Sequence, residues 1–288
     1  MNHSVASAGR HASPVVHVAG GGATLPGDAP EFRRFIAGSA PIALDGIDWD
    51  SIADTPVDSD VIRILTYMQD VESHTVVFPR TIFSQRAVND DVIGTFLVCW
   101  LYEEGMHGRA LAKFLDCAGH PVPPRTRKRT TAMDHVDRSM TTLLSALWTD
   151  FLALHMAWGA AHECTTIQAY RRLMALNDHP ILNELLRRII YDEARHFAFY
   201  MWQAEQRLQR RSVQRVVRAI MDRLYIPVGA THQPDELAVW VSARLFDGAA
   251  GRAAAARVDE TMAKLPGFAD ASLFGRWLVR KVYTAETA

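Results

Sequence analysis

This 288-residue chain has few cysteines, no long apolar run and no excess charge of either sign. Its three thiols, Cys99, Cys117 and Cys164, are scattered and odd in number, which favours a reducing compartment over a disulfide framework. A formal net charge of −1 gives no overall field for nucleic acid, so we expect no nucleic-acid partner. No apolar run reaches the ~18 residues of a membrane span. The N-terminus has no apolar signal-peptide core, so we expect a cytoplasmic protein.

The sequence also lacks the alternating pattern of strands over any length, which predicts a nearly all-helical fold. The first ~30 residues are rich in Gly, Ala, Ser and Pro and cannot bury enough apolar surface to become ordered. We therefore expect residues 1–57 to be a disordered tail and lead-in, with a short helix near Phe32–Ala37. The remaining chain, 58–288, is expected to be one domain with a core at 58–225 and smaller helices at 226–288.

Four long helices are predicted in the core from their capping and breaking residues. The first begins near Asp58 or Ser59, both good N-cap residues, and Pro79 should kink or end it. Glycine and proline bound the other helices, because glycine ends a helix readily and proline fits its first turn. These three helices are expected at about Asp90–Cys117, Asp134–Leu176 and Pro180–Arg211.

Two of these helices carry a carboxylate and an imidazole on their apolar faces. Glu104 and His107 are three residues apart, so both side chains leave the same side of the second helix. Glu193 and His196 repeat this spacing in the fourth helix. Such groups are costly to bury unless something compensates them. A metal ion is one candidate, and the alternative is two satisfied Glu–His pairs in the core of an ordinary bundle.

A single glutamate precedes each pair by about one helix and one loop. Glu72 lies 32 residues before Glu104 (104 − 72), and Glu163 lies 30 residues before Glu193 (193 − 163). One Glu from each of two helices and one Glu-x-x-His from each of two others form the ligand set of ferritin-like dimetal bundles. We therefore predict an all-α, ferritin-like four-helix bundle with extra C-terminal helices. Its donors suit two Fe(II) ions, with Mn(II) as the alternative. The predicted ligands are Glu72, Glu104, His107, Glu163, Glu193 and His196.

The two motifs resemble those of the soluble acyl-carrier-protein desaturases, which read roughly Glu-Glu-x-Arg-His-Gly and Asp-Glu-x-Arg-His. Here they read Glu103-Glu104-Gly105-Met106-His107-Gly108 and Asp192-Glu193-Ala194-Arg195-His196. Two departures stand out, because Met106 replaces the first motif's Arg and Phe197 follows His196 where that family commonly has Glu.

The resemblance implies roles for the ligands and for three further residues. Glu104 and Glu193 would bridge two irons, with one histidine on each iron. Trp100 and Asp192 would lie on the path by which electrons enter, and Thr166 would assist dioxygen activation. Asp192 is also a candidate acceptor for the second ring nitrogen of a ligand histidine.

The activity implied by the resemblance is dioxygen-dependent desaturation of an acyl chain on acyl carrier protein, with electrons from a ferredoxin-type donor. The basic run Arg207–Arg223 is a candidate dock for the acidic carrier, and a homodimer is expected. One alternative is a di-iron hydroxylase or N-oxygenase; Ile189 stands where arylamine N-oxygenases have an extra histidine, which counts against that branch. Another is iron handling or peroxide protection, although ferritins are shorter and the rubrerythrin Cys-x-x-Cys module is absent.

Overall fold

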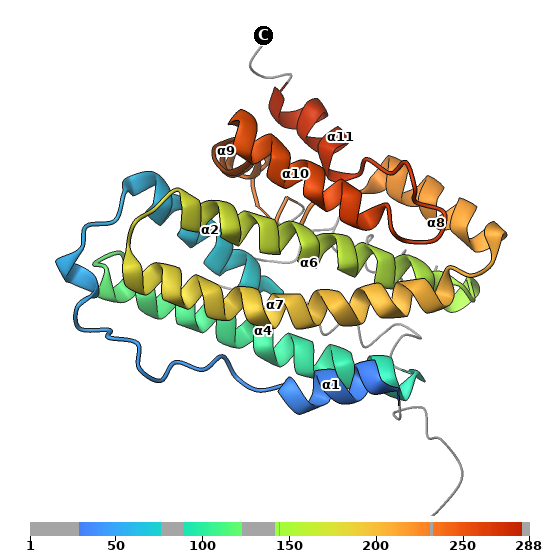
Figure 1. Ribbon diagram of the computed structural model, residues 1–288, viewed down its shortest axis with the longest axis horizontal. Helices are drawn as coiled ribbons and strands as arrows, with labels where there is room; N and C mark the ends of the chain where they lie inside the picture. The colour runs from blue at the N-terminus through green and yellow to red at the C-terminus, as the bar shows by residue number, and fades with distance from the viewer. Residues whose placement is uncertain (1–28, 76–88, 123–141, 144, 231–232, 284–288) are drawn as a thin grey trace, which may run out of the picture.

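The computed structural model describes residues 29–75, 89–122, 142–143, 145–230 and 233–283. Throughout these ranges every regular element is helical, which confirms the all-α prediction. The bundle is built from four long helices, α2 (Ser59–Thr75), α4 (Asp91–Cys117), α6 (Phe151–Ala175) and α7 (Pro180–Arg207) (Figure 1). The most extensive contacts join α6 to α7 and α2 to α4, so the bundle consists of two helical pairs.

Local capping explains why the predicted starts of α4 and α7 are confirmed. The Asp90 carboxylate accepts the backbone N–H groups of Val92 and Ile93, which would otherwise lack partners in the first turn of α4. Pro180 occupies the first turn of α7, where no backbone N–H is needed. The preceding His179 accepts the backbone N–H of Leu182 through its ring. Both helices therefore begin where short-range chemistry places them.

The third and fourth predicted helices differ from their expected bounds. The third, expected over Asp134–Leu176, is interrupted at residues 148–150: residues 142–143 and 145–147 are helical, and α6 begins at Phe151. The fourth helix ends at Arg207 rather than Arg211, and a separate helix, α8 (Arg211–Leu224), follows it. Residues 134–141 and the predicted breaker Pro79 lie outside the described residues.

A short helix in the lead-in packs on the bundle. Helix α1 (Pro30–Gly38) contains the predicted segment at residues 32–37 and lies against α4 and α7 (Figure 1). Its Phe35 ring lies 4.8 Å from that of Phe96 and 5.5 Å from that of Phe199. The lead-in therefore adds aromatic cover to one side of the core. The expected disordered tail, residues 1–28, lies outside the described residues.

The chain after α7 forms a second layer over the α6 side of the bundle (Figure 1). Besides α8, this layer contains α9 (Asp235–Phe246), α10 (Gly248–Met262), α11 (Phe274–Leu278) and a final π-helical turn, Val279–Tyr283. Asp259 of α10 fixes the start of α11 by accepting the backbone N–H groups of Phe274 and Gly275. The extra C-terminal helices are thus present and cover the bundle. In the described ranges, no helix has the length and apolar character that a membrane crossing requires.

Candidate metal centre

The six predicted ligands meet in the middle of the bundle. They form two groups, and in each group the ligand atoms all lie within 4.8 Å of one another. Each of the six residues is at most 5% exposed. Glu104 and Glu193 belong to both groups. The groups are Glu72, Glu104, His107 and Glu193, and Glu104, Glu163, Glu193 and His196.

Several buried atoms at this centre have no hydrogen-bond partner. They are Glu72 Oε2, Glu104 Oε1, Glu193 Oε1 and His107 Nδ1. His107 Nδ1 lies only 3.4 Å from Glu193 Oε1 and 3.9 Å from Glu72 Oε2, so these atoms face one another. A buried polar atom left without a partner costs about 1–3 kcal/mol. A convergent set of oxygen and nitrogen donors offers these atoms to a cation, and the cluster can therefore hold metal ions.

Burial of the four carboxyl groups in one cluster shifts their pKa values. Burial raises the pKa of Glu72, Glu104 and Glu163, and the charge of nearby Glu193 raises each of them further. Burial also acts to raise the pKa of Glu193, but its close contacts with the imidazoles of His107 and His196 outweigh burial and lower the pKa.

The pKa values of both imidazoles shift upward, whereas burial alone lowers the pKa of a histidine. Burial acts to lower the pKa of His107, but its hydrogen bond to Asp192 and its contact with the charged Glu193 outweigh burial and raise the pKa well above its usual value. Burial likewise opposes the charged form of His196, and its bonds to Glu103 and Glu193 raise its pKa to about 10. The pocket therefore attracts positive charge, which protons or metal cations can supply.

A carboxylate from the opposite helix holds the outer nitrogen of each histidine. His107 Nε2 on α4 lies 3.2 Å from Asp192 Oδ2 on α7, and His196 Nε2 on α7 lies 2.8 Å from Glu103 Oε2 on α4. Each ring thereby turns Nδ1 toward the centre: His196 Nδ1 is 3.1 Å from Glu104 Oε1. This arrangement fixes ring orientation and tautomer in metal sites.

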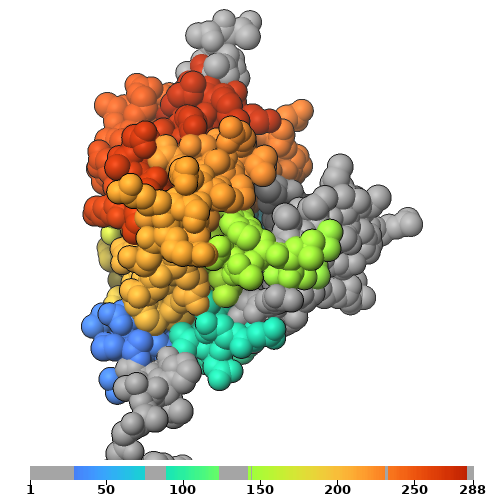
Figure 2. Space-filling view, turned by 90° about the vertical axis from the view of Figure 1, so that its right-hand side faces the viewer, coloured from blue at the N-terminus to red at the C-terminus, as the bar shows by residue number. Residues whose placement is uncertain are grey.

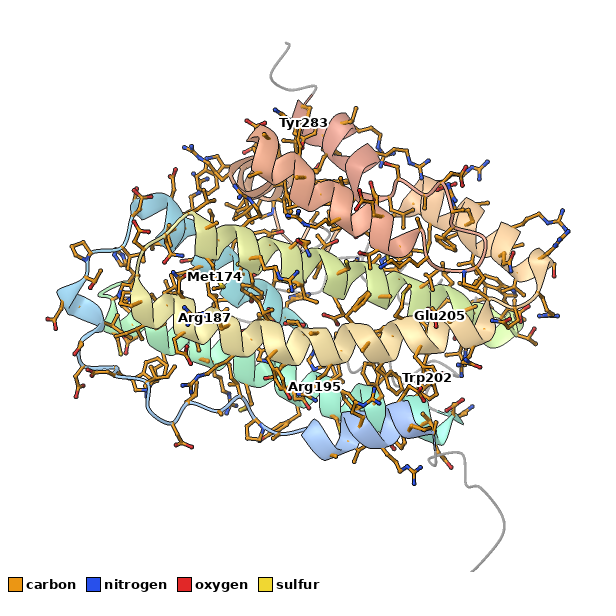
Figure 3. All side chains as sticks on the ribbon, viewed as in Figure 1. Met174, Arg187, Arg195, Trp202, Glu205 and Tyr283 are labelled. Atoms are coloured by element: carbon orange, nitrogen blue, oxygen red, sulfur yellow. The ribbon has the colours of Figure 1, made fainter. Side chains whose placement is uncertain are left out.

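One arginine joins the two supporting carboxylates. Arg195 Nη2 donates to Glu103 Oε2 at 2.7 Å and to Asp192 Oδ1 at 2.8 Å. Its side chain is 13% exposed and lies near the Phe35 ring of α1. Figure 3 labels it on the side of α7 that faces α1. Ser39, just after α1, donates its hydroxyl to Glu103. A single cation therefore neutralises the carboxylates behind both histidines.

Aromatic donors hold the two single glutamates. Trp100 Nε1 donates to Glu163 Oε1 at 2.8 Å, and the Tyr170 hydroxyl donates to Glu72 Oε1. The second oxygen of Glu72 is one of the unpaired atoms that face the centre. Tyr170 itself is 1% exposed, and burial followed by the charges of the glutamates raises its pKa well above the usual value.

The three further predicted residues lie at different places. Trp100 contacts the candidate ligand Glu163, whereas Asp192 contacts the candidate ligand His107, so they support different groups of candidate ligands. Thr166 lines a cavity that Glu72 also lines. Their roles in electron entry and dioxygen activation stay predictions.

Sequence reasoning did not single out Glu103, Arg195, Tyr170 or Ser39. Glu103 and Arg195 had a usable signal, since each adjoins a ligand inside the Glu-x-x-His motifs. Tyr170 also had one, because it follows Glu163 by seven residues, about two helical turns along the same face. Ser39 had none, since it lies 64 residues from its partner Glu103.

The predicted basic run is only partly available to a partner. Three of its arginines are held in ion pairs within the chain: Arg207 with Asp90, Arg210 with Asp150, and Arg218 with Asp222 and Asp270. These pairs tie α7 and α8 to neighbouring parts of the fold. The run therefore contributes to the tertiary structure as well as to the surface charge.

The remaining arginines form a mixed basic and apolar face on α8. Arg211, Arg215 and Arg223 are exposed, and no ion pair engages them within the described ranges. Val216 and Leu224 lie on the same helix at 46% and 61% exposure. Figure 2 shows α8, in orange, at the molecular surface. We call these five residues the α8 face.

Comparisons of the chain with protein families, with curated proteins and with solved structures find no match. The likeness to the desaturases therefore depends on the residues of the two motifs alone.

Proposed function

We propose that this protein is a dioxygen-dependent di-iron oxidase that desaturates an acyl chain carried on acyl carrier protein. The observation that carries the proposal is the sharing of Glu104 and Glu193 between two buried groups of ligands. Two metal ions that are bridged by carboxylates share those carboxylates as ligands. Bound iron would supply the redox chemistry by which dioxygen attacks an unactivated C–H bond.

The reaction balances with the proposed partners. The acyl chain loses two hydrogen atoms and gains a double bond. A ferredoxin-type donor supplies two electrons, and dioxygen leaves as two water molecules after taking up the two hydrogens and two further protons. An alternative donor of the same electron count would serve equally.

The chain's own residues prepare the centre for this chemistry. Asp192 and Glu103 orient the two histidines, while Trp100 and Tyr170 orient the two single glutamates. The stacked rings of Phe96 and Phe199, 3.9 Å apart, help to keep water away. A dry, preorganised site protects reactive species from side reactions.

The α8 face is the proposed dock for the acidic carrier. Its three exposed arginines would attract acidic side chains, and Val216 and Leu224 would add apolar contact. Charge complementarity of this kind mostly sets the association rate and the register of the complex. The expected homodimer and cytoplasmic location stay predictions.

The proposal is tested by metal analysis followed by mass spectrometry of a reaction mixture. Protein loaded anaerobically with Fe(II) should hold two irons per chain. With reductant, ferredoxin, dioxygen and a panel of acyl carrier proteins, it should give a product lighter by two hydrogen atoms. Glu193→Ala should lose bound iron, whereas Glu184→Ala, a half-exposed glutamate on the same helix, should not.

The alternative outcomes separate the functions. A product heavier by one oxygen atom would identify a hydroxylase or N-oxygenase. Iron oxidation with no organic product would identify iron handling. Failure of the wild-type protein to bind iron in stoichiometric amount would refute the metal centre.

A further inference from the structure

The six candidate ligands are so deeply buried that a metal ion can reach them only where the fold opens. Each of them is at most 5% exposed, inside a bundle of four long helices. A cover opens most easily where it has few buried contacts and few tethers to the rest of the fold. The elements that cover the centre differ greatly in this respect.

The C-terminal layer covers the α6 side and is firmly held. Phe246 and Phe274 are at most 2% exposed, and their rings meet edge to face at 4.7 Å. Arg172 of α6 donates to the carbonyl oxygen of Leu245 at 2.9 Å, and Tyr283 donates to that of Phe246 at 3.0 Å. Opening on this side would break several such contacts at once.

Helix α1 covers another side, where it packs on α4 and α7, and it is held much less firmly (Figure 1). It has nine residues, and a helix that short is not stable by itself in water. Phe35 is its buried residue, at 3% exposure, whereas Ile36 is 37% exposed. Its charged residues, Glu31, Arg33 and Arg34, are exposed and make no ion pair within the described ranges.

The contacts of α1 fall on the network that supports one half of the centre. The Phe35 ring lies 6.3 Å from the ring of His196 and 5.7 Å from the guanidinium carbon of Arg195. At the C-cap of α1, the Ser39 hydroxyl donates to Glu103, which in turn holds His196 Nε2 at 2.8 Å. Movement of α1 away from the bundle would uncover Glu103 and Arg195 first, and then the edge of His196.

The closed position of α1 leaves part of Arg195 without partners. Its Nη2 donates to two carboxylates, whereas Nε and Nη1 are buried and have no hydrogen-bond partner among the described residues. The end of α1 is pressed against the arginine stem, since a Cβ on Gly38 would lie 3.2 Å from Arg195 Cδ. Water would supply partners once α1 opened, so this cost offsets part of the gain from burying Phe35.

The chain just after α1 is anchored, which makes α1 a hinged flap. Arg188 of α7 donates to the carbonyl oxygens of Ala43 at 2.7 Å and Asp45 at 3.0 Å. Ile42 is 7% exposed. Residues 39–41 connect this anchor to α1, so opening needs changes in only a few backbone angles.

We propose that α1 is a flap that gates the entry of metal ions into the centre. Its opening exposes Glu103, whose carboxylate attracts a cation. A cation beside Glu103 lies next to His196, whose other ring nitrogen faces the second group of candidate ligands. The inference rests on the metal centre of the proposed function, but it concerns how the centre is filled and is independent of the acyl substrate.

The rates of metal entry and exit test the gate without any turnover. Full-length apoprotein is mixed anaerobically with Co(II) in a stopped-flow instrument, and the visible absorption gives the association rate. Excess chelator then gives the dissociation rate. Phe35→Ala removes the ring that holds the flap closed, so both rates should rise by about 10- to 100-fold. Because none of the candidate ligands lies on α1, both should rise equally and Kd should stay the same.

Two further variants and one further measurement accompany Phe35→Ala. Phe32→Ala removes a half-buried ring of the same flap, and should raise both rates by about 3- to 10-fold even if Phe35→Ala fails to fold. Phe268→Ala is the matched control, since it deletes a fully buried ring in the C-terminal layer and should leave both rates unchanged. In the wild type, hydrogen exchange should reach the amides of α1 before those of α4 and α7.

Each result decides for or against the gate. Equal rises of both rates in the flap variants, without a rise in Phe268→Ala, support it. Unchanged rates in both flap variants, an equal rise in Phe268→Ala, or exchange of α1 as slow as that of α4 would overturn it. A rise in dissociation alone would also overturn it, because α1 would then stabilise bound metal. These results do not depend on an acyl product, so failure of the desaturase proposal is seen separately. Absence of Co(II) binding by the wild type would refute the centre and the gate together.

Discussion

Replacing Arg195 by Met tests whether one arginine supports both halves of the candidate metal centre. The substitution keeps a long apolar stem but removes the Nη2 donor that lies 2.7 Å from Glu103 and 2.8 Å from Asp192. Each carboxylate contacts the outer ring nitrogen of one of the two candidate ligand histidines. Loss of one partner of a buried ion pair lowers the free energy of unfolding by about 3–5 kcal/mol. Because Arg195 is partly exposed, we expect the lower figure, about 3 kcal/mol.

The effect on metal binding should be symmetric. Removal of residues that orient metal ligands typically weakens binding by about 10- to 100-fold. Because Arg195 contacts both carboxylates, both binding steps should weaken in Arg195→Met. Asp192→Asn should weaken mainly the step that uses His107, and Glu103→Gln mainly the step that uses His196. Anaerobic titration with Co(II), followed by its visible absorption, resolves the two steps.

Arg187→Met is the matched control for this experiment. Arg187 lies on the same helix (Figure 3), but it is 58% exposed, and among the described residues its ion-pair partner is Glu184. Exposed pairs contribute roughly 0–1 kcal/mol, so neither stability nor metal binding should change much. If Arg195→Met bound both metals as tightly as the wild type, or lost only one of them, the shared role of Arg195 would be disproved.

Three further predictions follow from the same structure. Tyr170→Phe removes the hydrogen bond to Glu72 with little change of shape, and should lower metal affinity by up to about 10-fold in a titration while leaving the fold intact. Gly159→Ala places a methyl group against the ring of Tyr200, and should lower the free energy of unfolding by about 1–3 kcal/mol in urea denaturation. Charge reversal of the exposed arginines of the α8 face should slow association with an acidic acyl carrier protein, most at low salt. The reversed residues are Arg211, Arg215 and Arg223.

Each of these predictions has its own contrary result. Unchanged metal affinity in Tyr170→Phe would mean that Glu72 is held without its tyrosine. Stability of Gly159→Ala equal to the wild type would show that Tyr200 moves aside freely. The docking control reverses three exposed cations elsewhere, and an equal loss of association there would reject the α8 face as the dock. The control residues are Arg33, Arg34 and Lys264.

Helix boundaries were predictable where short-range chemistry decides them. Asp90 caps α4 through its own side chain, and Pro180 suits the first turn of α7. The start of α6 was not predictable in this way. It follows a turn at residues 148–150, in which Asp150 pairs with Arg210, a residue 60 positions away. Helical periodicity is a local property of the sequence, so it carries no information about such a long-range contact.

The sequence by itself determined the four-helix architecture and the six residues that converge in its core. Helical periodicity is a local property, so a spacing of three residues already places Glu104 with His107, and Glu193 with His196, on one face. Their polarity among apolar neighbours marked both faces as belonging to a common buried site.

Only the tertiary structure decided which residues support those ligands. The support runs crosswise, from Glu103 on α4 to His196 on α7 and from Asp192 on α7 to His107 on α4. Arg195 then joins the two carboxylates. These pairings depend on the register between helices, and that register is set by side-chain packing across the whole bundle rather than by the spacing within any one helix.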